Sequence, residues 1–301
     1  MISYIQMVGN FDEKIKNVSR RLRRRFFSPL QGLVEGFFAL VWSMLPLKIK
    51  ANLLEKDSCF SRLNWQRGHI LMGVNSYQAM RRLDALKSEP YTAAWIENDI
   101  MAGDVFYDIG ASTGPFSLLA FASTGGKAKV YAFEPVASSF ALLVGNVSIN
   151  DASGLVVPLK IALADRTGFT SFAYGSLSAG TTKHPGLLPP TAFGILKNLG
   201  TREIFSELMY VWALDDFVER AKILLPTHVK IDVDGSEVGV LSGARKVLSN
   251  PNLRLVQVEV RKGDGGTVEG VFTIMRDAGF KLIAKYRDES QRAADYLFRR
   301  T

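Results

Sequence analysis

The regular exchange of short apolar runs for amphipathic helical stretches after residue 104 is the feature that most constrains this fold. The apolar runs have the length and composition of buried strands, and helical patterns separate most of them. Strands joined by helices of this length form a mostly parallel sheet that helices cover on both faces. We expect strands at 105–109, 129–133, 155–163, 228–233 and 253–260, and helices after Gly114 and at 135–149, 237–248 and 268–278.

The end of the chain departs from this alternation. Residues 280–285 and 296–299 have the pattern of strands, and no helical pattern lies between them. Two strands joined in this way pair antiparallel as a hairpin. A mostly parallel sheet that ends in such a hairpin resembles the class I methyltransferase fold, whereas every crossover of a plain dinucleotide-binding fold is helical. The expected fold class is therefore α/β: a Rossmann-like class I methyltransferase sheet with a C-terminal antiparallel hairpin and an N-terminal helical segment.

Residues 170–208 also interrupt the alternation, between the third and fourth expected strands. Glycines and prolines such as Gly175, Gly180, Pro189 and Pro190 are frequent there, and the pattern predicts an irregular segment. Long irregular insertions in compact domains are usually functional lids or binding loops. Open α/β sheets bind ligands at their carboxyl edge, so we expect this insertion to lie over the active site.

The strongest local motif is Asp108-Ile-Gly110-Ala-Ser112-Thr-Gly114, where a strand meets a helix. Glycine allows a sharp turn and a close approach of backbone to a ligand, and the N-terminus of the helix favours an anionic group. Glu134 follows Gly114 by 20 residues, at the end of the second strand. An acidic residue there accepts hydrogen bonds from a ribose, so the spacing predicts a nucleoside cofactor without a 2′-phosphate.

A second polar group follows the fourth strand, in Lys230-Ile-Asp232-Val-Asp234-Gly-Ser-Glu237. We expect Asp232 beside the cofactor, at the point where the order of the strands reverses. Asp234 has two interpretations: a helix cap, for which Glu237 completes the capping-box spacing, or a site residue. Glu259, near the end of the fifth strand, faces the same edge, unless it forms an ion pair with a basic residue that follows it.

These motifs occur in an order that resembles the FkbM family of S-adenosylmethionine (SAM)-dependent methyltransferases, over about residues 88–300. The resemblance rests on Glu89…Thr92, Gly103-Asp-Val105, the 108–114 loop, Tyr131-Ala-Phe-Glu-Pro135, Asn146…Asn150, Ala162-Leu-Ala-Asp165, Leu214-Asp-Asp-Phe217, 230–237 and Leu241-Ser-Gly-Ala244. It implies that the cofactor-binding residues are Asp108, Gly110, Ser112, Gly114, Glu134, Pro135, Ala162, Asp165 and Asp232, with the Ala162–Asp165 turn near the adenine. The sequence departs from the family at Ser112, where asparagine is usual, and at Arg261, where histidine or asparagine is commoner.

The resemblance implies methyl transfer from SAM to a hydroxyl oxygen, with a sugar of a glycan or a secondary metabolite as the acceptor. An alcohol nucleophile benefits from a general base. Asp232 is the first candidate, as a base or as a group that orients the acceptor, and His184 in the insertion is the second. A divalent metal ion held by Asp232 and Glu259 would be a third way to activate the oxygen, although no complete set of metal ligands is visible.

Three other classes of protein fit the sequence less well. A dehydrogenase would need glycines closer together than Gly110 and Gly114. A nucleic-acid amino-methyltransferase usually has Asn/Asp-Pro-Pro-Tyr after the fourth strand, where this chain has Asp232-Val-Asp-Gly. A non-catalytic, membrane-associated adaptor with a SAM fold is the last alternative, and the intact set of Asp108, Glu134 and Asp232 argues against it.

The N-terminal segment, which we bound at residues 1–87, is separate from the methyltransferase domain expected at 88–301. Residues 1–50 hold nine Lys or Arg and three Asp or Glu, in a chain whose net charge is +8. A run of arginines between Arg20 and Arg25 precedes an apolar stretch at 26–47 that contains two prolines and Glu35. The distance between the prolines is short for a bilayer span, and a charge at its centre would be costly.

Two hypotheses therefore concern residues 20–47. The stretch is either a helix that packs on the catalytic domain or a second subunit of a homo-oligomer, or a surface helix whose arginines meet anionic lipid headgroups. No motif supports nucleic-acid binding. The lone cysteine, Cys59, fits a reducing compartment, so we expect a cytoplasmic protein that is either free or peripheral on the inner face of the membrane.

Overall fold

The computed structural model describes residues 59–181, 186–188, 205–233, 235–261, 265–286 and 293–301, together with single positions between 33 and 49. The chain divides into two compact units, Met1–Ser58 and Cys59–Thr301. This boundary lies earlier than the one expected at residue 87. The described positions of the first unit are mostly helical. None of the described helices has the length and apolarity that crossing a bilayer requires.

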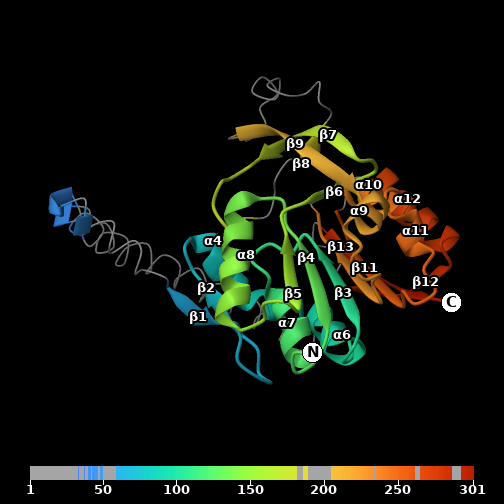
Figure 1. Ribbon diagram of the computed structural model, residues 1–301, viewed down its shortest axis with the longest axis horizontal. Helices are drawn as coiled ribbons and strands as arrows, with labels where there is room; N and C mark the ends of the chain where they lie inside the picture. Colours follow the sequence, from blue (N-terminus) through green and yellow to red (C-terminus); the bar gives the residue numbers. More distant parts are fainter. Residues whose placement is uncertain are drawn as a thin grey trace, which may run out of the picture. The chain divides into compact units, whose positions relative to one another are not determined.

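The core of the second unit is a seven-stranded sheet, composed of β3 (Val105–Ile109), β4 (Lys129–Phe133), β5 (Val156–Leu159), β10 (His228–Ile231), β11 (Leu255–Arg261), β12 (Phe280–Tyr286) and β13 (Ala293–Arg300). The strands lie in the order β12-β13-β11-β10-β3-β4-β5 (Figure 1). From β5 to β11 the pairs are parallel, and β13 pairs antiparallel with both β11 and β12. This order confirms the expected mostly parallel sheet with a C-terminal antiparallel hairpin.

Helices cover both faces of the central sheet: α6 (Pro90–Asp99), α7 (Pro115–Ser123) and α8 (Ala137–Ile149) on one, and α9 (Leu214–Ala221), α10 (Glu237–Ser242), α11 (Arg245–Leu248) and α12 (Gly265–Asp277) on the other. Successive side chains of a strand point to opposite faces. Tyr107 of β3 therefore joins the core under α9 to α12, whereas the adjacent Phe106 joins the core under α6 to α8.

Two elements expected to be continuous are each split. The run at 155–163 forms β5 and then β6 (Ala162–Ala164), which belongs to a different sheet. The helix expected at 237–248 is divided into α10 and α11 around Gly243. A Cβ at Gly243 would lie 2.1 Å from the carbonyl oxygen of Ala164, so the backbone of this junction packs directly on β6.

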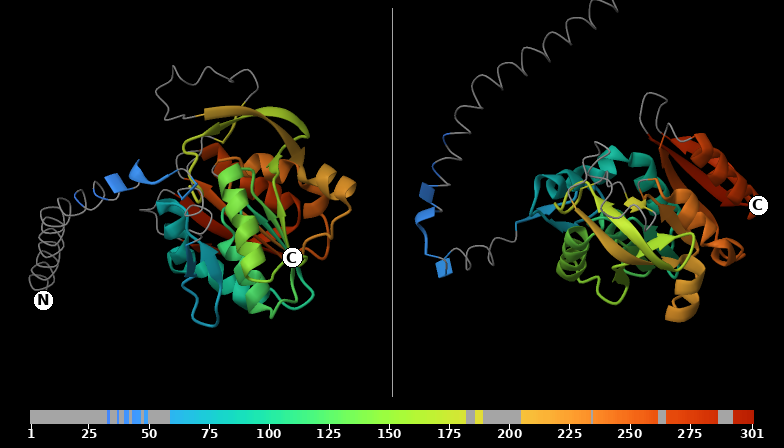
Figure 2. Two further views of the ribbon diagram at one scale, coloured as in Figure 1. Left: turned by 60° about the vertical axis from the view of Figure 1, so that its left-hand side comes forward. Right: turned by 90° about the horizontal axis from the view of Figure 1, so that it is seen from above.

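The insertion is more regular than its glycines and prolines predicted. A four-stranded sheet in the order β6-β9-β7-β8 includes β7 (Gly168–Tyr174), β8 (Gly186–Leu188) and β9 (Phe205–Ala213). Long-range pairing of β7 with β9, in register from Gly168↔Val211 to Tyr174↔Phe205, overrides the weak local strand signal. Figure 1 and both views of Figure 2 show this second sheet as a layer across one end of the central sheet.

Residues 59–88 pack into the second unit through β1 (Phe60–Arg62), β2 (Leu71–Gly73), α4 (Tyr77–Arg81), the 3₁₀ turn η2 (Arg82–Asp84) and α5 (Ala85–Ser88). The expectation of a helical N-terminal segment is wrong over β2, because Ile70 and Met72 are buried while Leu71 is exposed, which is the alternation of a strand. The Gly73 N–H donates to Asn146 Oδ1 of α8 at 2.6 Å. This segment is therefore part of the domain that holds the central sheet.

Candidate active site

A cavity lies between the second sheet and the carboxyl ends of β3, β4 and β10. It contains about 880 Å³ of empty space, part of which is open to solvent. The residues that line the cavity include Arg82, Gly110, Ser112, Phe116, Glu134, Pro135, Val136, Ile161, Ala162, Leu163, Phe172, Thr181, Leu187, Lys230, Asp232 and Val233.

The loop after β3 turns sharply at Gly110, whose φ is +86°. A Cβ at Gly110 would lie 1.9 Å from the carbonyl oxygen of Asp232, so the backbone of the protein itself leaves no room for a side chain at this position. Ser112 also has a positive φ, +53°, and its Oγ is buried without a hydrogen-bond partner in the described part of the chain. The loop thus presents its backbone and one unsatisfied hydroxyl to the cavity.

Gly114 was expected to contact the cofactor, but it does not line the cavity. It is the N-cap of α7 with a φ of +88°, and a Cβ there would lie 2.4 Å from a methyl carbon of Leu143 in α8. Its role in this structure is therefore to let α7 and α8 pack closely. No side chain caps the first turn of α7, whose Phe116 faces the cavity.

Glu134 is buried at the end of β4 and binds the glycine-containing loop. Its Oε2 accepts the Ser112 N–H and its Oε1 accepts the Val136 N–H, both at 2.8 Å. Burial raises the pKa of this carboxyl to about 7, although the two N–H donors oppose the rise. The side chain is held in place by the backbone, and each oxygen retains a lone pair that can accept a further hydrogen bond.

Asp108 lies in β3 under the cavity and is not among the residues that line it. The Ser117 hydroxyl donates to its Oδ2 at 2.6 Å, whereas its buried Oδ1 has no hydrogen-bond partner among the described residues. Burial raises the pKa of Asp108, and the nearby Lys230 ammonium acts in the opposite direction. Asp108 therefore contributes to the electrostatics of the site from beneath it.

Lys230 and Asp232 form a buried ion pair at the end of β10, with 3.0 Å between Nζ and Oδ2. The Lys230 side chain is 3% exposed and that of Asp232 is 21% exposed. Burial is the largest single influence and opposes both charges, but the ion pair together with the neighbouring charges and hydrogen bonds outweighs it, so the pKa of Lys230 is raised and that of Asp232 is lowered. Asp232 also has a side-chain hydrogen bond with Glu259.

These contacts bear on the expected role of Asp232. A carboxylate with a lowered pKa is a weak base near neutral pH. The arrangement therefore fits the orienting role of Asp232 better than the role of general base. Asp232 and Glu259 lie together, as the metal hypothesis requires, and no group of three or more His, Cys, Asp or Glu in the described ranges could hold a metal ion.

Of the other predicted site residues, Pro135 and Ala162 line the cavity. Asp165 does not; its side chain is 53% exposed and pairs with the neighbouring Arg166, which suits a surface position better than a cofactor contact. His184 and Asp234 lie outside the described residues.

Two charged residues that line the cavity, Lys230 and Arg82, were not among the site residues expected from the sequence. Lys230 had a visible signal, because a lysine inside an apolar strand needs a buried partner. Arg82 had none, since only the packing of η2 brings it to the cavity.

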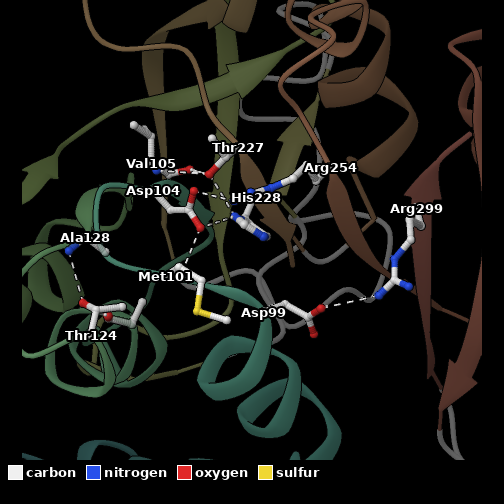
Figure 3. Close-up of polar contacts among 11 residues, drawn as sticks. Asp99, Met101, Asp104, Val105, Thr124, Ala128, Thr227, His228, Arg254 and Arg299 are labelled. Carbon is white, nitrogen blue, oxygen red and sulfur yellow. Dashed lines mark hydrogen bonds and ion pairs between the residues drawn. The ribbon is translucent and has the colours of Figure 1, made fainter.

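A second polar cluster lies at the opposite edge of the central sheet (Figure 3). Asp104 pairs with Arg254, and its Oδ2 lies 3.8 Å from Nδ1 of the buried His228, which also contacts Thr227 at 2.9 Å. Burial lowers the pKa of His228 to about 4. His228 begins β10 while Asp232 follows its end, so this cluster supports the amino edge of the sheet and takes no part in the cavity.

The sheet order with its antiparallel end and the cavity at the carboxyl ends of β3, β4 and β10 define a Rossmann-like methyltransferase. A family model described as "Methyltransferase FkbM domain" matches residues 108–282, which is more than half of the chain. The chain therefore belongs to the FkbM methyltransferase family, as the order of its motifs indicated.

Two relatives and one solved structure extend this comparison. The chain is 28% identical to hexuronic acid methyltransferase AglP of Haloferax volcanii over 188 residues, which are 62% of this chain and 68% of the relative. It is 30% identical to 31-O-demethyl-FK506 methyltransferase FkbM of Streptomyces tacrolimicus over 207 residues, or 62% and 76% of the two chains. A crystal structure of methyltransferase FkbM from Methylobacillus flagellatus KT is 15% identical with a TM-score of 0.48, and the match covers 75% of this chain and 55% of that one.

Proposed function

We propose that this methyltransferase uses SAM to methylate a hydroxyl oxygen on a sugar of a glycan or on a secondary metabolite. The observation that carries the proposal is the cavity in which the Gly110–Ser112 loop meets Glu134 on one side and Asp232 on the other. The names of two relatives, a hexuronic acid methyltransferase and a 31-O-demethyl-FK506 methyltransferase, support a sugar or metabolite acceptor.

The residues of the cavity fit SAM in their chemistry. Glu134 holds its two oxygens toward the loop with lone pairs free for ribose hydroxyls. Ile161 and Leu163 provide an apolar wall suited to an adenine ring. The unpartnered Ser112 Oγ is a polar atom that a bound molecule can satisfy. These residues would hold the cofactor at the carboxyl edge of the sheet.

When bound, SAM supplies a methyl group that is made electrophilic by its positively charged sulfur. The chain's part is to position the acceptor hydroxyl in line with that methyl group, which can contribute up to about 7–11 kcal/mol. The Asp232 carboxylate can accept a hydrogen bond from the acceptor hydroxyl and orient its oxygen. Lys230 keeps that carboxylate ionised and in place.

Calorimetric titration of the folded protein with SAM and with S-adenosylhomocysteine tests the proposal. We expect both ligands to bind with one site per chain. The absence of measurable binding to either, in protein whose circular dichroism shows an intact α/β fold, would contradict it. Gly110→Ala serves as the control for a disrupted site, because the Cβ of the alanine would collide with the Asp232 carbonyl oxygen and distort the loop.

A further inference from the structure

Among the charged side chains that line the cavity, Arg82 differs in its pairing. Lys230 and Asp232 pair with each other, and Glu134 accepts two backbone N–H groups. Arg82 donates its Nε to the Gly180 carbonyl at 3.1 Å. Its two terminal nitrogens form no hydrogen bond or ion pair with any residue that the structure describes. A guanidinium facing a cavity with these donors free is suited to an anion.

Contacts between η2 and the insertion hold Arg82 in this position. Gly180 accepts from Arg82, and its own N–H donates to Ser139 Oγ of α8 at 3.0 Å. The Ser76 hydroxyl donates to the Ala179 carbonyl at 2.8 Å. These hydrogen bonds hold residues 178–181 beside the cavity, which Thr181 lines. The stem of Arg82 is anchored while its terminal nitrogens remain available.

The charges around the cavity indicate which part of a ligand Arg82 faces. Its positive charge acts on both Glu134 and Asp232, lowering the pKa of each. Arg82 therefore lies within electrostatic range of the predicted ribose contact and of the predicted site of methyl transfer. The methionine moiety of SAM extends from the ribose past the sulfur, and its carboxylate is the one anionic group of the cofactor.

We propose that the Arg82 guanidinium binds the carboxylate of the methionine moiety of SAM. The inference rests on the proposed SAM site and adds a residue to it. Arg82 precedes the matched family domain at 108–282, so residues 59–88 would complete the cofactor site from outside that domain. A planar guanidinium can donate two parallel hydrogen bonds to a carboxylate, which lysine cannot reproduce.

Paired titrations with SAM and decarboxylated SAM test this assignment, because the second ligand lacks only the carboxylate. The variants are Arg82→Gln, which removes the charge, Arg82→Lys, which keeps it, and Arg81→Gln as control. Arg81 is the exposed neighbour and does not line the cavity. We expect Arg82→Gln to weaken SAM binding about 10- to 100-fold, the usual effect of losing hydrogen bonds to a charged group. Binding of decarboxylated SAM should change less than about twofold, since that ligand has no group for Arg82 to hold.

The SAM affinity of Arg82→Lys should lie between those of wild type and Arg82→Gln. Arg81→Gln should have the wild-type affinity for both ligands. Equal losses for the two ligands would overturn the assignment and show that Arg82 only shapes the cavity. Unchanged SAM affinity in Arg82→Gln with a raised KM for the acceptor would also overturn it, and would place an acidic acceptor at Arg82. If the wild-type protein binds neither ligand, the proposed SAM site itself fails, and the inference fails with it.

Discussion

If Glu134 holds the ribose of SAM as proposed, we expect SAM binding to depend on pH. Glu134 is buried, and burial raises its pKa to about 7. Both of its oxygens already accept backbone N–H groups, so only the ionised form has lone pairs free to accept ribose hydroxyls without a proton in the way. A protonated Glu134 must be ionised before it can act as this acceptor. We therefore expect affinity for S-adenosylhomocysteine to fall as the pH is lowered through 7.

The size of the effect follows from the fraction of ionised Glu134. With a pKa of about 7, about nine chains in ten carry the carboxylate at pH 8 and about one in eleven at pH 6. The apparent Kd is the intrinsic Kd divided by the competent fraction. It should rise about tenfold between pH 8 and pH 6, and a plot of log Kd against pH should reach a slope near −1 below pH 6. Isothermal titration calorimetry in buffers matched for ionic strength gives these values.

Glu134→Gln is the matched variant, because it keeps the shape of the side chain but cannot titrate. At pH 8 this variant should bind S-adenosylhomocysteine more weakly than wild type, with a loss of binding free energy of about 1.5–3 kcal/mol, the usual contribution of a hydrogen bond to a charged group. Its Kd should then be flat from pH 6 to 8. A wild-type Kd that does not change over this range would refute the reasoning, as would a variant that retains the wild-type slope.

The same ionisation predicts the stability of the ligand-free protein. The folded pKa of Glu134, about 7, lies above the ordinary value of 4.5, so the folded state binds a proton that the unfolded chain releases. Its contribution is fully present below about pH 4.5 and is lost as the pH rises through 7, by at most about 3 kcal/mol. Urea unfolding at several pH values should show this loss in wild type and not in Glu134→Gln.

The remaining predictions concern catalysis and the N-terminal segment. Asp232→Asn should leave SAM affinity within a few-fold of wild type and strongly lower turnover, while thermal unfolding shows a lower Tm because Lys230 loses its buried counter-ion; full activity would remove Asp232 from the mechanism. Turnover should survive EDTA, and its loss with recovery on adding magnesium would favour the metal hypothesis. If residues 20–47 bind membrane, replacing Arg20, Arg21, Arg23, Arg24 and Arg25 with glutamine should release the protein from anionic vesicles in sedimentation assays. The binding free energy should fall by about 1 kcal/mol for each arginine near the surface, and SAM binding should be unchanged. If they form a subunit interface, Phe37→Asp with Val41→Asp should instead change the mass measured by light scattering.

The central sheet and its helices could be predicted from the sequence because each of these elements has a local signal. Short apolar runs mark β3, β4, β10 and β11, helical patterns mark the helices between them, and the exchange of the two implies a parallel sheet without knowledge of any contact. The absence of a helical pattern between residues 280–285 and 296–299 was enough to predict the antiparallel end. The position of Glu134 after β4 likewise follows from spacing along the chain, since the carboxyl ends of parallel strands meet at one edge.

Several features depend on residues distant in sequence that meet only in the folded chain. The strands β7 and β9 pair across the insertion, although glycines and prolines predicted irregular structure there. Residues 59–88 join the second unit because Ile70 and Met72 reach the same core as α6 to α8. Neither contact has a local signature, because each is stabilised by burial against a surface that the local sequence does not describe.

The site shows the same division between residue identity and residue role. The sequence identified Gly110, Glu134 and Asp232, but the structure shows that Gly110 makes room for the Asp232 carbonyl. The lowered pKa of Asp232 comes from Lys230 in the buried end of β10, and Arg82 reaches the cavity from η2, far from the motifs. A motif specifies which chemical groups the chain carries, whereas charge state and reach depend on desolvation and on neighbours brought together by tertiary packing. Only the folded structure determines those.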